Sequence, residues 1–206
     1  MISFAQNQLI SSHSSSLNIT YPREVSIVFG NYPFPEKIHN LMIKVKSGVD
    51  PTMKNYSNVQ GDMTPWHYFN EDKDFIDFIN FIINKHQATH PHYFKHFYSK
   101  RTVDGAWGNL YKKGDSLTPH VHYSESGILF LSHGCELILP ELNIKIKPSP
   151  GDYYIFPPVI LHGFDPILND EERCSIAFNL PEKNQSVFMI EKEIKKINER
   201  KNSKHK

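Results

Sequence analysis

Short strand patterns separated by turn residues fill the second half of the sequence and limit the folds open to it. From Arg101 onward, β-branched and aromatic runs alternate with turn signals such as Lys113-Gly114-Asp115. The predicted strands cover residues 106–112, 127–132, 136–139, 142–146, 152–156 and 174–180. No helical pattern separates them, so the sequence predicts an antiparallel sandwich or jelly roll rather than a parallel sheet.

The first half of the chain adds flanking elements to this β core. Asn70 is the expected N-cap of a helix whose apolar face would pack on a sheet. The residues of that face are Phe75, Phe78, Ile79, Ile82 and Ile83. A weaker helical pattern covers residues 36–45, and the β-branched run 24–30 predicts a strand. Residues 47–66 are rich in turn formers and predict a long surface segment with short extended pieces.

The whole chain, residues 1–206, is predicted to form a single domain, because its length suits one sizeable core. We expect N-terminal strands and a supporting helix over residues 21–100, and the β core over residues 101–181. A C-terminal helix and a basic tail are expected over residues 182–206. The fold class is therefore an all-β core with flanking helices.

Composition and charge exclude several classes of function. The formal net charge is +1, so no long-range field favours nucleic acid or an anionic membrane surface. No apolar run approaches the roughly 20 residues that a membrane helix needs, and residues 1–10 lack the pattern of a signal peptide. We therefore expect a cytoplasmic protein in which Cys135 and Cys174 are free thiols.

Two histidines separated by one residue, His120 and His122, are the first candidates for chemistry. Alternate side chains of a strand point to the same face, so the two imidazoles could share one metal ion. A third imidazole, His162, follows the run FPPVIL, and a two-sheet barrel can bring it close to the first two. Three protein ligands leave coordination positions open for substrate and dioxygen, which a catalytic metal needs and a structural zinc site lacks.

Arg173 lies eleven residues after His162 and shares a strand face with Ser175. A guanidinium binds a carboxylate through two parallel hydrogen bonds, and a neighbouring hydroxyl adds a third donor. A surface ion pair is the alternative role for Arg173. Ala177 and Asn179 continue the same face, which favours an inward position. The sequence thus predicts an inward anchor for an acid in the same barrel as the metal.

Further histidines, His86, His90, His92 and His96, cluster around Pro91. A second metal site is conceivable, yet no regular helix or strand face collects these side chains around the proline. A solvated connector is the favoured interpretation.

The candidate site residues belong to a wider pattern, which consists of Gly151, Phe156-Pro157, His162, Pro166 and Arg173-x-Ser175. In combination, this pattern resembles the iron(II)- and 2-oxoglutarate-dependent oxygenases, most closely the small phage- and bacterial-type members related to prolyl 4-hydroxylases. The resemblance covers residues 105–180 and extends to residues 58–66. It implies a cupin-like double-stranded β-helix with Fe(II) and 2-oxoglutarate as cofactors. The implied reaction is a hydroxylation coupled to decarboxylation of 2-oxoglutarate to succinate.

The resemblance also implies roles for individual residues. His120 and His162 would be iron ligands. Arg173 and Ser175 would hold the distal carboxylate of 2-oxoglutarate, and Tyr111 would contact the same group.

One residue departs from the usual pattern of this family. Most members have Asp or Glu where this sequence has His122, although the phage-type group often has His-x-His as well. Three neutral ligands would leave the iron with one more net positive charge than the usual triad. Glu125 and Asp165 are the alternative carboxylates, and neither lies at the expected spacing.

Two other functions remain open. A three-histidine metalloenzyme of the cupin type would use the same ligands without 2-oxoglutarate, and Arg173 would then have no cosubstrate to bind. A non-catalytic barrel that binds a ligand or partner would hold its histidines through hydrogen bonds alone. Nothing in the sequence distinguishes a prolyl peptide from a small-molecule substrate, and no feature indicates an oligomeric state.

Overall fold

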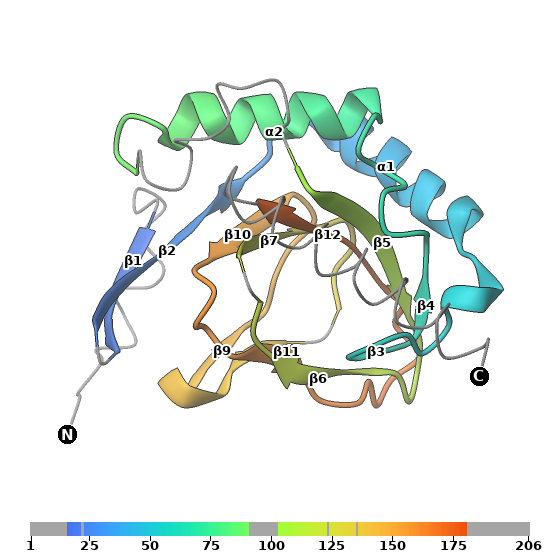
Figure 1. The fold of residues 1–206 in the computed structure, drawn as a ribbon. Coiled ribbons are helices and arrows are strands. Elements are labelled where there is room, and N and C mark those ends of the chain that lie inside the picture. The colour runs from blue at the N-terminus through green and yellow to red at the C-terminus, as the bar shows by residue number, and fades with distance from the viewer. Residues whose placement is uncertain (1–15, 22, 91–102, 123, 135, 181–206) are drawn as a thin grey trace, which may run out of the picture.

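Two antiparallel sheets face each other, and two helices cover the outer surface of the larger sheet (Figure 1). The structure is a computed structural model that describes residues 16–21, 23–90, 103–122, 124–134 and 136–180. The expected C-terminal helix and tail, Cys135, His92 and His96 therefore lie outside the described residues.

The strands of the two sheets alternate along the chain. In spatial order, the larger sheet consists of β1 (Ser16–Tyr21), β2 (Arg23–Asn31), β10 (Asp152–Phe156), β7 (Glu125–Phe130), β12 (Arg173–Leu180), β5 (Gly105–Tyr111) and β4 (Asp62–Met63). The smaller sheet consists of β3 (Val59–Gln60), β6 (Ser116–His120), β11 (His162–Phe164), β8 (Leu137–Leu139) and β9 (Ile144–Ile146). From β5, the chain crosses to the smaller sheet for β6, returns for β7, crosses again for β8 and β9, returns for β10, and crosses once more for β11 before β12. This alternation gives the predicted jelly roll.

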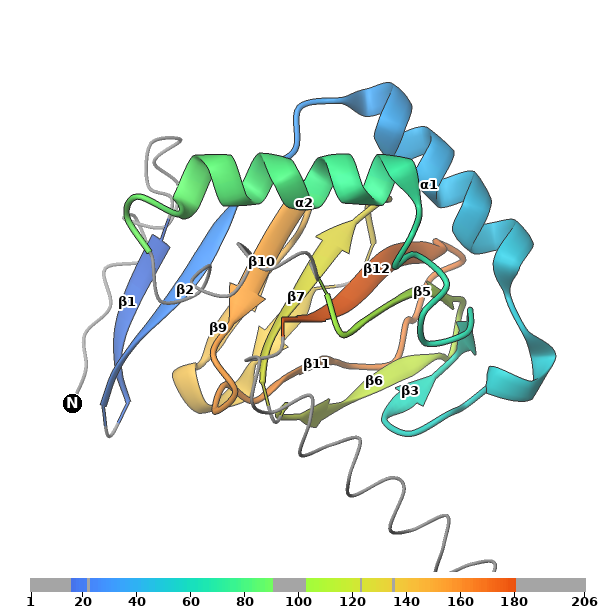
Figure 2. The same cartoon turned by 45° about the horizontal axis from the view of Figure 1, so that its top comes forward.

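The main hydrophobic core lies between the larger sheet and the helices α1 (Pro35–Gly48) and α2 (Lys73–His86). Figure 2 shows α2 lying across β10, β7 and β12, with α1 at its side. Ile176 and Phe178 of β12 belong to this core. Because side chains alternate along a strand, Ser175, Ala177 and Asn179 face the smaller sheet, as predicted.

The N-terminus of α2 differs from the prediction. Asp72, not Asn70, is the N-cap, and its carboxylate accepts hydrogen bonds from the backbone N–H groups of Asp74 and Phe75 at 3.0 and 3.1 Å. The amide of Asn70 lies 3.3 Å from His67 Nδ1 instead. Both residues are good N-caps, and the three-dimensional course of the preceding turn decides between them.

The interpretation of the His86 region as a solvated connector is wrong for the part that the structure describes. His86 is fully buried and His90 nearly so. His86 ends α2, and its Nε2 lies 2.6 Å from the hydroxyl of Tyr153 on β10. The polar ring is buried because the sheet supplies a hydrogen-bonding partner, which the local sequence does not show.

Other elements follow the expectations with shifted ends. The predicted strand at residues 24–30 is β2, and the predicted helix at residues 36–45 is α1. Residues 47–66 contain a short 3-10 helix, Pro51–Met53, followed by β3 and β4. Another 3-10 helix, Pro140–Leu142, shortens the strand predicted from residue 142.

Two observations bear on the remaining expectations from composition. Cys174 is a free thiol, as predicted, and it is buried. Across the described ranges, the helices are too short or too polar to cross a lipid bilayer.

Candidate metal centre

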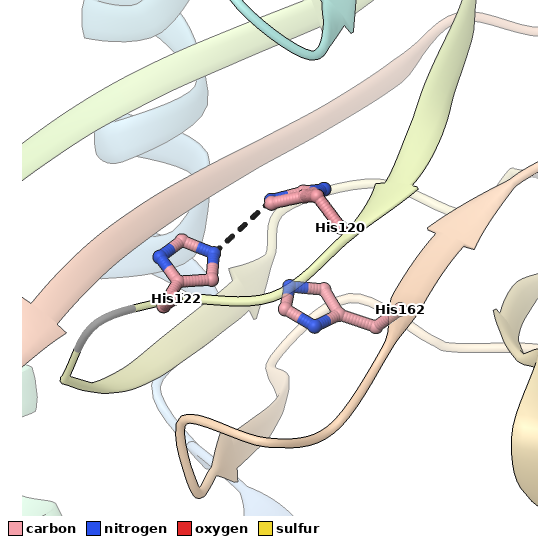
Figure 3. A group of neighbouring side chains, drawn as sticks. All are labelled: His120, His122 and His162. Atoms are coloured by element: carbon pink, nitrogen blue, oxygen red, sulfur yellow. Dashed lines mark hydrogen bonds between the residues drawn. The ribbon is translucent and has the colours of Figure 1, made fainter.

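Three histidine side chains point toward one another at the smaller sheet (Figure 3). His120 is the last residue of β6 and His162 is the first residue of β11, and the two are cross-strand partners. The expectation that His122 shares a strand with His120 is wrong, because β6 ends at His120. The backbone N–H of His122 donates instead to the carbonyl of Pro158 at 3.3 Å. Antiparallel pairing and one loop contact thus bring the three imidazoles together.

The separations within this group suit a shared metal ion. The candidate ligand nitrogens all lie within 4.8 Å of one another, and the Nε2 atoms of His120 and His122 are 3.1 Å apart. A metal with imidazole bonds of about 2.0–2.1 Å separates neighbouring nitrogens by roughly 3 Å. Glu125 and Asp165 are not part of the group that the described residues form, so its donor set is three imidazoles.

Hydrogen bonds at the far side of each ring determine which nitrogen faces the centre. Nδ1 of His120 lies 2.9 Å from the carbonyl oxygen of Thr118, and Nδ1 of His162 lies 2.9 Å from that of Ile160. A carbonyl oxygen only accepts, so both Nδ1 atoms donate and both Nε2 atoms carry lone pairs. Lone pairs that converge in this way repel one another unless a cation lies between them, and this arrangement fits a bound metal.

The three imidazoles are neutral at physiological pH. Burial lowers the pKa of each ring below its ordinary value of 6.5, to about 4 for His122 and about 3 for His162. Repulsion from neighbouring positive charge, including that of Arg173, adds to the effect of burial at His162. Neutral imidazole is the form that binds metal, so protons compete little for this site.

Arg173 is almost completely buried, with 1% of its surface exposed. Its guanidinium carbon lies 4.0 Å from the ring centroid of Phe164, 4.8 Å from that of Phe130 and 5.8 Å from that of Tyr111. Phe164 is the second residue after His162, so the guanidinium and the imidazoles occupy neighbouring parts of the same interior. Stacking on aromatic rings orients the plane of a guanidinium without using its N–H groups, which lie at its edge.

Further polar groups line this interior from the larger sheet. Ser175 of β12 and Asn109 of β5 are cross-strand partners, adjacent to the paired Arg173 and Tyr111. Ser175 Oγ and Asn109 Oδ1 are buried and have no hydrogen-bond partner within the described part of the chain. Buried polar atoms are normally satisfied, so these two fit a polar ligand that lies beside Arg173.

The residues predicted from the sequence thus lie in two adjoining groups. His120, His122 and His162 form the first group. Arg173, Ser175 and Tyr111 lie in the second, where the buried ring of Tyr111 packs edge-on against Phe164 with centroids 4.7 Å apart. Their roles in binding metal and cosubstrate stay predictions.

Three residues of this region were not predicted as site residues, although Asn179 was expected to face inward. Asn109 lies two residues before Tyr111 on the same face of β5, and Asn179 shares a face of β12 with Arg173. This spacing was the signal available in the sequence. Asn179 Oδ1 lies 3.1 Å from Nδ1 of His122. Phe164 has no local signal, because only the pairing of β11 with β6 brings its ring to the guanidinium.

Comparisons with known proteins support the fold. No family model matches the sequence, and no curated protein matches it. Among solved structures, the chain is similar to a viral collagen prolyl hydroxylase from Paramecium bursaria Chlorella virus-1, in complex with 2-oxoglutarate. That pair has 16% identity and a TM-score of 0.56, covering 82% of this chain and 97% of the hydroxylase.

Two further structures share the architecture. A prolyl 4-hydroxylase from Pseudomonas putida matches with 12% identity and a TM-score of 0.54, covering 76% of this chain and 93% of that one. HygX from Streptomyces hygroscopicus, with nickel and 2-oxoglutarate bound, matches with 11% identity and a TM-score of 0.51, covering 74% and 81%. The chain therefore shares the double-stranded β-helix fold of these three structures.

Proposed function

We propose that this protein is an iron(II)- and 2-oxoglutarate-dependent oxygenase that hydroxylates a small-molecule or peptide substrate. The observation that carries the proposal is the convergence of three neutral imidazoles beside a buried arginine within one barrel. The similarity in fold to 2-oxoglutarate-binding oxygenases supports it. His120, His122 and His162 would bind the iron through Nε2.

Arg173 and Ser175 would hold the distal carboxylate of 2-oxoglutarate, with Tyr111 and Asn109 at its sides. A guanidinium and a hydroxyl offer three donors to one carboxylate. The charge of the site also favours this ligand, since three neutral imidazoles do not neutralise a divalent ion and a dianion does.

Iron(II) and 2-oxoglutarate, when bound, would supply the oxidising chemistry, in which 2-oxoglutarate is converted to succinate and carbon dioxide. The chain's own part is to bind, orient and exclude water. Phe130 and Phe164 surround the guanidinium and keep solvent away from the carboxylate that it would bind. The two prolyl hydroxylases among the similar structures make a prolyl peptide the first substrate to test.

Anaerobic titration of the purified protein with iron(II) and 2-oxoglutarate tests the proposal. We expect a metal-to-ligand charge-transfer band that requires both ligands, and release of succinate after admission of air. Iron binding without any 2-oxoglutarate response would favour a three-histidine enzyme of another type. Absence of both iron binding and the band would contradict any metal-dependent function.

Arg173→Gln tests the carboxylate anchor. Loss of a bidentate, charge-assisted contact should weaken 2-oxoglutarate binding on the order of 100-fold, while iron binding persists. Lys113→Gln is the matched control, because it removes one positive charge from an exposed side chain that pairs with Asp170. Unchanged 2-oxoglutarate affinity in Arg173→Gln would show that the anchor lies elsewhere.

A further inference from the structure

We infer that Asn179 is a positioning residue that makes His122 present Nε2 to the metal. The inference rests on the proposed metal site and concerns a residue outside the set of ligands. Asn179 lies on β12, in the larger sheet, whereas His120 and His162 lie on strands of the smaller sheet. Its side-chain oxygen is 3.1 Å from Nδ1 of His122.

The three imidazoles differ in what holds their outer nitrogen. His120 and His162 are each held by a backbone carbonyl two residues earlier in the chain, from Thr118 and Ile160. These acceptors belong to the same local segment as the histidine, and no substitution of a side chain removes them. The outer nitrogen of His122 is held by a side chain from the opposite sheet.

The local backbone explains why His122 needs this contact. The residue follows the end of β6, and its backbone is held by the N–H bond to Pro158. A backbone bond does not by itself fix rotation about Cα–Cβ and Cβ–Cγ, and the ring of His122 also stacks on that of His162, with centroids 5.2 Å apart. The stacking restricts the tilt of the ring, and the bond from Nδ1 to Asn179 decides which edge faces the centre, so Nε2 lies 3.1 Å from Nε2 of His120.

Asn179 itself is held firmly. Its strand pairs on both sides, with Gly105 of β5 and Ser126 of β7 opposite Asn179. A residue whose backbone pairs with strands on both sides moves little, so its side chain can hold a neighbouring ring in one orientation. The larger sheet therefore contributes to the metal centre through this amide, in addition to the carboxylate anchor.

The amide chemistry of Asn179 makes the inference specific. An amide accepts through oxygen and donates through nitrogen, so it can satisfy either tautomer of His122. With the oxygen toward Nδ1, the ring carries its proton on Nδ1 and keeps a lone pair on Nε2. A carboxylate at this position only accepts, so Asn179→Asp should enforce the same tautomer and make the ring a stronger ligand. Asn179→Leu has similar volume and no acceptor.

The test uses cobalt(II) as the metal probe and the ring nitrogens as a second readout. Asn179→Leu should lower cobalt affinity roughly 10- to 100-fold, as measured by titration of the cobalt absorption bands. Asn179→Asp should bind cobalt at least as tightly as the wild type. Ser126→Ala, which alters the cross-strand partner of Asn179 and no ligand, should bind with wild-type affinity.

Long-range nitrogen–proton NMR of the metal-free proteins reads the tautomer directly. We expect the Nδ1–H form of His122 in the wild type and in Asn179→Asp, and a mixture in Asn179→Leu.

Wild-type affinity and tautomer in Asn179→Leu would overturn the inference. If that variant does not fold, weaker cobalt binding by Asn179→Asp than by the wild type would overturn it. A wild-type protein that binds no metal but shows the expected tautomers would instead contradict the proposed function.

Discussion

His86 is a buried base outside the proposed metal centre. Its ring is fully buried and meets the hydroxyl of Tyr153 at 2.6 Å. Burial lowers the pKa of His86 from 6.5 to about 4, and the positive charges of Lys85 and His90 add to this effect. In the unfolded chain, the ring recovers its ordinary pKa. Between these two values, the unfolded state therefore binds a proton that the folded state does not.

This difference predicts how stability depends on pH. The contribution of His86 is present above about pH 6.5 and is lost as the pH falls toward 4, by about 3 kcal/mol at most. His86→Gln stays neutral throughout and can still bond to Tyr153, so its free energy of unfolding should decline less. Urea unfolding of both metal-free proteins at pH 7 and pH 4.5 measures the difference, and the metal-site histidines contribute equally to both. Equal declines would contradict the prediction.

Residues differ in how readily the sequence indicates their role. His120, His162 and Arg173 were found because their side-chain chemistry and spacing are specific in combination. His86 was misplaced, because the polarity of its neighbours favours solvent and its partner Tyr153 is 67 residues away. The role of Asn179 depends on where the chain runs after β6, which no local pattern indicates.

Asp72, the N-cap of α2, also connects α2 to α1 through an ion pair. Besides the two backbone N–H groups, Asp72 binds Lys44 of α1 at 2.7 Å, and the same lysine reaches Asp74 at 2.9 Å. Asp72→Ala removes the cap and one ion pair. We expect the free energy of unfolding to fall by about 1–2 kcal/mol. Urea unfolding measures it.

Glu71→Ala is the control for the cap, because Glu71 is exposed and precedes Asp72. This change removes the same type of charge from the same region, and stability should change by no more than about 0.5 kcal/mol. If both variants lost equal stability, local charge rather than the Asp72 cap would be the cause.

Strands made of apolar, β-branched or aromatic runs were predictable from the sequence, and strands defined by their pairing partners were not. The core strands β5, β7, β10 and β12 match predicted runs within a few residues. β11 is three residues long and contains a glycine, so its sequence carries little strand signal. Leu17, Ile19 and Tyr21 do alternate with polar residues in β1, but the polar run before them favours a loop.

The residues of the proposed site come from both sheets of the molecule. The smaller sheet and the loop that follows β6 supply the imidazoles, whereas the larger sheet supplies Arg173, Ser175 and Asn179. The larger sheet is supported by two helices and the main core, whereas no helix within the described ranges packs on the smaller sheet. A metal bound by the three histidines would therefore cross-link the less supported part of the fold.

This division predicts that metal binding raises the thermal stability of the entire domain. At a metal concentration 100-fold above Kd, binding to the folded state adds about 2.7 kcal/mol, which for a domain of this size raises Tm by roughly 5–10 °C. Addition of a chelator should reverse the rise.

Two variants separate the contributions of metal and cosubstrate in the same thermal measurement. His162→Ala removes a ligand from β11 and should abolish the metal-dependent rise. Arg173→Gln should keep the metal-dependent rise and lose the additional rise that 2-oxoglutarate gives to the metal-loaded wild type. Because Arg173 lies on the larger sheet and His162 on the smaller one, loss of both rises in both variants would mean that the two sheets form a single inseparable site. An unchanged metal-dependent rise in His162→Ala would show that the stabilising ion binds elsewhere on the chain.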